Sequence, residues 1–137
     1  MVAPTAPKQN RAPGCSDLVA LMEDWPQSWA GVEADLEVGQ GLVAPMRAFL
    51  MHLHARGLSR TTLRRHLHNL WAIGGEILRA INDDARLRRR QPAQLLLDAV
   101  ADGAAPLVYG ATEAEQRAVD ATARKLLRFL DALPPGA

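Results

Sequence analysis

The 137-residue chain has little of what several protein classes require. Its single cysteine, Cys15, excludes an internal disulfide and a zinc site built from several thiolates, and we expect it to be an incidental exposed thiol. No apolar run approaches the roughly 18 residues of a membrane span. Residues 1–14 lack the apolar core of a secretory signal, which predicts a reducing, cytoplasmic location. Aromatic residues make up only 4%, too few for a platform that stacks a run of bases.

Acidic residues are also missing from the centre of the chain. From Val38 to Gly75, 38 consecutive residues contain no Asp or Glu, while the same segment carries five arginines and all four histidines. Residues 1–37 carry a net charge of −4, so the overall net charge of +1 averages over opposed regions. An exposed helix face normally mixes both signs, and a segment of one sign indicates a polyanionic partner.

Motifs of common catalytic sites are absent. The sequence contains no G-x-x-x-x-G-K-[ST] loop, no G-x-S-x-G elbow and no G-x-G-x-x-G turn. The histidine pairs 52/54 and 66/68 are each two residues apart, so on a helix the members of a pair point to opposite sides and cannot share one metal ion. The only tyrosine, Tyr109, has no catalytic surroundings in sequence, and we expect it to pack. We therefore predict no enzyme activity, no cofactor and no metal.

The apolar spacing predicts an all-α fold of five or six helices. Residues 1–16, rich in proline and small residues, are expected to form a disordered tail, and residues 17–133 a single domain. The first helix should begin at Leu18, capped by Ser16 or Asp17, and end at Pro26. Gly39 and Gly41 should break the chain. Further helices are expected at 43–56, 60–82, 92–101 and 113–133, the last opened by a capping box of Thr112 and Glu115.

Residues 43–82 should form a tight antiparallel helical hairpin at the centre of the bundle. Gly57 suits a left-handed helix end, and Ser59 suits the N-cap of the next helix. Along that helix a continuous apolar face predicts the core, with Trp71 included in it. Gly74 lies on this face, which predicts close approach of another helix.

The predicted interface lies on the opposite face and at the turn of the hairpin. A helix N-terminus offers free N–H groups to an anion, and hydroxyl and guanidinium groups surround this one. Such a helix start is one way in which proteins hold the DNA backbone. The candidate nucleic-acid-binding residues are Arg56, Ser59, Arg60, Thr61, Thr62, Arg64, Arg65, His68 and Arg79.

A family resemblance rests on the same residues. The run Phe49-Leu50-Met51-His52-Leu53-His54-Ala55-Arg56-Gly57-Leu58-Ser59-Arg60-Thr61-Thr62-Leu63, continuing to Leu70, resembles the hairpin in the core-binding (SAM-like) domain of phage-integrase-type tyrosine recombinases. The resemblance implies an all-α DNA-clamping module, with Ser59, Arg60, Thr62 and Arg64 near the backbone. The catalytic set of those recombinases is not found here, so strand cleavage is not implied. The remainder, including 69–77 and 115–130, is similar to short bacterial proteins of no known activity.

Two functions stay open at this point. The first is a small non-catalytic protein that contacts the backbone of double-stranded DNA through 43–82, for example as an accessory factor of a mobile element. The second is a protein-interaction module, in which the hairpin docks an acidic partner or a second copy buries the side of Met51 and His68. In the second case the acidic N-terminal third could itself screen the hairpin.

Overall fold

The protein is an all-α bundle, as predicted. The computed structural model describes residues 14–133, and every regular element within this range is helical. The predicted tail at 1–16 falls mostly outside the described residues, and Ser16 already begins the first helix. The elements, with η marking 3₁₀ turns, are α2 (Ser16–Ala20), η1 (Leu21–Asp24), α3 (Trp25–Trp29), α4 (Asp35–Ala55), α5 (Arg60–Asp83), η2 (Ala85–Arg89), α6 (Pro92–Val100) and α7 (Glu113–Asp131).

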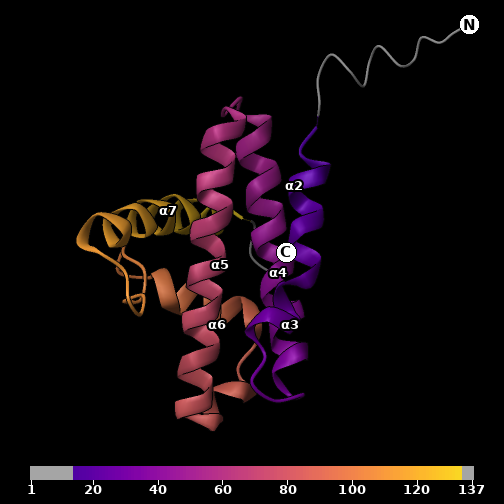
Figure 1. The fold of residues 1–137 in the computed structure, drawn as a ribbon, viewed down its shortest axis with the longest axis vertical. Helices are drawn as coiled ribbons and strands as arrows, with labels where there is room; N and C mark the ends of the chain where they lie inside the picture. Colours follow the sequence, from indigo (N-terminus) through magenta and orange to yellow (C-terminus); the bar gives the residue numbers. More distant parts are fainter. Residues whose placement is uncertain (1–13, 134–137) are drawn as a thin grey trace, which may run out of the picture.

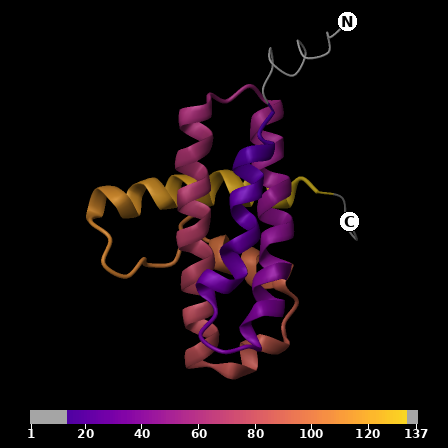
Figure 2. The ribbon, with the colours of Figure 1, turned by 45° about the vertical axis from the view of Figure 1, so that its right-hand side comes forward.

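The helices form three layers, with the α4–α5 hairpin in the middle (Figures 1 and 2). The N-terminal segment α2–η1–α3 runs along one face of the hairpin, and α6 and α7 lie on the other. Helix α7 crosses the hairpin, with its C-terminal part behind α4 and its N-terminal part projecting past α5. The connection between α4 and α5 extends beyond this crossing. We call this part of the hairpin, residues 52–65, the turn end.

The first helical segment does not stop at Pro26, contrary to the prediction. The chain passes from α2 through the 3₁₀ turn η1 into α3, and Pro26 occupies the first turn of α3. A proline is tolerated there because a helix leaves its first N–H groups without intrahelical partners. The segment thereby buries Leu18, Met22, Trp25 and Trp29 in one continuous line against the hairpin.

Helix α4 starts eight residues earlier than the sequence predicted, because Gly39 and Gly41 lie inside it. Both glycines permit close contact with proline rings. A Cβ on Gly39 would lie 3.0 Å from Pro26, and a Cβ on Gly41 would lie 2.4 Å from Pro92. Their helix-breaking tendency is therefore overridden by packing, which brings α3 and α6 close to α4. The predicted buried stripe of this helix, Met46 to Leu53, is confirmed.

Helix α5 matches its prediction closely. Ser59 caps it by accepting a hydrogen bond from the Thr62 backbone N–H at 3.2 Å. The close approach expected at Gly74 is also confirmed, since a Cβ there would lie 2.2 Å from the indole ring of Trp29. The Trp29 indole N–H donates to the Trp71 carbonyl at 3.0 Å, which holds α3 against α5 at Gly74.

The lower end of the hairpin is closed by a buried ion pair between η2 and the start of α4. Asp35 is fully buried, and its carboxylate accepts from the Arg88 guanidinium at 2.7 Å and from the backbone N–H groups of Gly31 and Val32. Burial alone would raise the pKa of Asp35, but these hydrogen bonds hold it below its ordinary value of 3.8. We call this region, η2 with the residues that flank it, the η2 end.

Candidate nucleic-acid interface

The turn between the two long helices is built as the sequence predicted. Gly57 has φ of +89°, the left-handed conformation that ends α4. The Ser59 hydroxyl both accepts from the Thr62 N–H and donates to Thr62 Oγ1 at 3.0 Å. These two side chains are therefore occupied in forming the helix start, which leaves the arginines as the groups available to an anion.

Arg60 is already partly neutralised. Its guanidinium forms a bidentate ion pair with the carboxylate of Asp17 in α2, and both side chains are about half exposed. The hydrogen bonds lower the pKa of Asp17 and raise that of Arg60. The acidic N-terminal segment thus meets the basic hairpin at this position.

The remaining α5 candidates share one exposed face near the turn end. Thr61, Arg64, Arg65 and His68 are exposed, and Thr62 is half-buried. Within residues 14–133 neither Arg64 nor Arg65 takes part in an ion pair, and the same holds for Arg56 at the end of α4. These three guanidinium groups form the free part of the predicted interface.

Arg79 does not belong to this group. It lies 14 residues beyond Arg65, or about 21 Å along the helix. Its guanidinium pairs with Glu76 at 3.2 Å and lies over the Tyr109 ring, 5.2 Å from the ring centre. The structure therefore separates this residue from the other predicted site residues.

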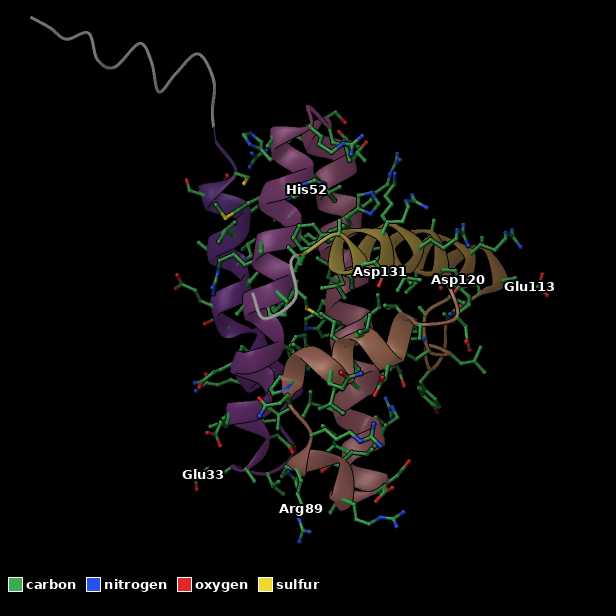
Figure 3. All side chains as sticks on the ribbon, turned by 180° about the vertical axis from the view of Figure 1, so that it is seen from behind. Glu33, His52, Arg89, Glu113, Asp120 and Asp131 are labelled. Atoms are coloured by element: carbon green, nitrogen blue, oxygen red, sulfur yellow. The ribbon has the colours of Figure 1, made fainter. Side chains whose placement is uncertain are left out.

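Helix α7 adds two cations that the sequence prediction missed. Lys125 and Arg128 line a cavity together with Arg56 and His52 of α4. Figure 3 shows His52 on the upper part of the hairpin, just above the C-terminal half of α7 that ends at Asp131. The net charge of −2 over residues 92–137 hid this cluster, because most acids of that segment lie elsewhere.

A buried polar seam fixes α7 against α5 beneath these cations. His66 Nδ1 lies 2.8 Å from Thr122 Oγ1, and the Asn69 side-chain amide donates to the same hydroxyl at 2.9 Å and to the Ala118 carbonyl at 3.2 Å. Burial lowers the pKa of His66, and the charges of Lys125 and Arg65 lower it further. The pKa of His66 therefore lies below its ordinary value of 6.5, so its imidazole is mainly neutral at pH 7.

Among the described residues, most arginines at the η2 end are paired, unlike Arg56, Arg64 and Arg65 at the turn end. Three of the four form ion pairs: Arg86 with Asp84 at 2.9 Å, Arg88 with Asp35 at 2.7 Å, and Arg90 with Asp98 at 3.0 Å. Figure 3 shows the fourth, Arg89, at the opposite end of the molecule from His52. Helix α5 alone spans about 36 Å, so the two arginine groups cannot form one face.

Three predictions about individual side chains are wrong. Trp71 is 41% exposed, because it lies at the edge of the apolar face and its indole N–H donates to the Ser28 hydroxyl. Tyr109 is 82% exposed on the 101–112 loop and does not pack in the core. Cys15, which directly precedes α2, is buried and not exposed.

The described residues form neither a membrane-spanning helix nor a cluster of metal ligands. No helix within residues 14–133 has both the length and the apolar character of a membrane crossing. Over the same part of the chain, no three His, Cys, Asp or Glu side chains come together as metal ligands.

Comparisons with known proteins reveal little family information. No family model matches the chain, and no solved structure matches it. It is 32% identical over 97 residues to the ATP-binding cassette sub-family A member 7 of Rattus norvegicus. That match covers 66% of this chain but only 4% of the rat protein, so it does not assign the chain to a family.

Proposed function

We propose that this chain is a non-catalytic nucleic-acid-binding protein that holds the backbone of DNA at the turn end of the hairpin. The observation that carries the proposal is the group of free cations there: Arg56, Arg64 and Arg65 from the hairpin, joined by Lys125 and Arg128 from α7. Guanidinium and ammonium groups from three helices near one end of the hairpin suit the closely spaced charges of a phosphate backbone.

The distribution of acids supports the same site. No residue from 38 to 75 is acidic, and Asp17, which pairs with one of the predicted residues, engages Arg60. A reducing, cytoplasmic location and the likeness of 49–70 to a recombinase core-binding hairpin form part of this proposal.

Duplex binding at two salt concentrations tests the proposal. Fluorescence anisotropy of a labelled DNA duplex should show binding at low salt that weakens steeply as salt is added, because phosphate contacts release counterions. Changing Arg64 or Arg65 to Ala should each reduce the slope of log affinity against log salt by about one. Arg89→Ala, which removes an exposed arginine at the η2 end, is the matched control and should leave the slope unchanged. Absence of low-salt binding, or an equal effect of Arg89→Ala, contradicts the proposal.

A second candidate function rests on a different surface. Trp71, Leu107 and Tyr109 are large exposed apolar side chains, and Trp71 and Tyr109 line the same two hollows beside α5. Exposed apolar groups that gather in this way are typical of protein-interaction sites. Light scattering distinguishes the two candidate functions. If the protein is a dimer, and Tyr109→Ser makes it monomeric without changing its affinity for DNA, this surface serves self-association.

A further inference from the structure

The turn end contains a cavity whose walls differ sharply in character. It lies between the C-terminal ends of α4 and α7 and has a volume of about 330 Å³. Phe49, Leu53 and Phe129 form its apolar floor. Arg56, Lys125 and Arg128 stand at its rim, all three exposed. No carboxylate is among the residues that line it.

The sequence builds this cavity from two matching helix faces. On α4 the lining residues are Phe49, His52, Leu53 and Arg56, and on α7 they are Lys125, Arg128, Phe129 and Ala132. Both sets follow the spacing i, i+3, i+4, i+7, which places each set on a single face of its helix. Each helix therefore presents a mixed basic and apolar stripe to the other.

Phe129 is the aromatic surface that a ligand in the cavity would meet. Its ring is half-buried, with its centre 5.6 Å from that of Phe49 and 5.0 Å from that of His52. Phe49 is completely buried and serves as support beneath it. A flat aromatic ligand can stack in this position while an attached anion reaches the rim cations.

The hollows beside Trp71 are less suited to an anion. Glu115 lines one of them and Glu76 the other, and the one arginine there, Arg79, is paired with Glu76. The cavity at the turn end alone, among those described, combines an aromatic floor with a rim of free cations.

We propose that this cavity holds a single unpaired nucleotide, with its base on Phe129 and its phosphates at Arg56, Lys125 and Arg128. The proposal rests on the proposed function, because it specifies the form of DNA that the turn end prefers. A base inside a duplex is stacked and paired and cannot enter, whereas single strands and frayed ends offer their bases. The low aromatic content is compatible with this site, since it accommodates one base and not a run of bases.

The test compares single-stranded and duplex forms of one oligonucleotide that contains 2-aminopurine. We expect the single strand to bind about five- to hundredfold more tightly at equal salt, the gain that stacking of one base provides. The 2-aminopurine fluorescence of the single strand should fall on binding, because stacking quenches it. Phe129→Leu should abolish the quenching and most of the preference, while duplex affinity stays within about twofold.

A second variant guards against a folding defect in Phe129→Leu. Lys125→Gln removes one exposed rim charge and should weaken single-strand binding several-fold, whereas Arg117→Gln, on the exposed N-terminal half of the same helix, should not. Equal affinity for both DNA forms without quenching overturns the nucleotide site and leaves the duplex proposal intact. Failure of both forms to bind contradicts both proposals.

Discussion

The two ends of the α4–α5 hairpin both carry clustered arginines, yet their guanidinium groups have different surroundings. At the η2 end, carboxylates on α4, α6 and the α5–η2 junction take up Arg86, Arg88 and Arg90. At the turn end, the described residues contain one such ion pair, between Arg60 and Asp17.

A count of arginines therefore does not identify a binding surface. Residues 86–90 form the densest basic run in the sequence, but three of its four arginines, Arg86, Arg88 and Arg90, are paired with nearby acids. The turn-end cations are more scattered in sequence and come together only when α7 crosses the hairpin. A guanidinium without a carboxylate partner has all of its N–H groups available to a ligand, whereas a paired one has some of them already engaged.

Loss of the buried ion pair should produce the largest effect on stability. The Arg88 guanidinium is largely buried, and Asp35→Ala removes the carboxylate that pairs with it. Because a mostly buried charge is then left without a partner, the free energy of unfolding should fall by about 3–5 kcal/mol. Urea denaturation followed by circular dichroism measures the change. Arg64→Ala at the turn end is the comparison and should leave the denaturation midpoint nearly unchanged. Similar losses in the two variants would contradict the distinction between the ends.

Acid titration should distinguish the buried ion pair at the η2 end from the buried polar seam between α5 and α7. The folded pKa of Asp35 is below 3.8, so the unfolded chain takes up the proton first, and the stability from this group is lost as pH falls below 3.8. The folded pKa of His66 is below 6.5, so the unfolded state is favoured as pH falls below 6.5. We therefore expect the free energy of unfolding to decline in two separate pH windows.

Two variants assign these windows to their residues. His66→Gln should remove the decline just below pH 6.5. Asp35→Asn should reduce the decline below pH 3.8, to which Asp17 and Asp84 also contribute because their pKa values are lowered as well. A stability curve that is flat from pH 7 to pH 5 in the unaltered protein would show that His66 is not held neutral by its surroundings.

The smallest expected effect concerns the screening of Arg60. Asp17→Asn frees this guanidinium at the turn end and should raise affinity for duplex DNA by about two- to fivefold at low salt. Asp84→Asn frees Arg86 at the η2 end and should not change it. Anisotropy titrations of the two variants side by side provide the measurement, and equal gains would mean that location does not matter.

Much of the fold follows from the sequence where local signals and packing agree. The cap at Ser59, the left-handed Gly57 and the capping box at Thr112 depend on nearby residues and were predicted correctly. Gly39 and Gly41 were misread, because rings of distant prolines, and not local preference, determine their helical state.

The candidate site was only half predictable for the same reason. The free hairpin arginines could be identified from the acid-free segment. The contribution of Lys125, Arg128 and Phe129 depends on where α7 crosses, and nothing local to that helix indicates its partner. Their spacing of i, i+3, i+4 places them on one face of α7, but it does not show which helix that face meets.

The most direct test of the account is an amide NMR map of the protein titrated with a short DNA duplex at low salt. We expect chemical-shift changes and line broadening at residues 52–68 and 121–132, and none at residues 85–90. Changes centred on η2, or spread evenly over both ends of the hairpin, would contradict the claim that free and not merely abundant arginines form the binding surface.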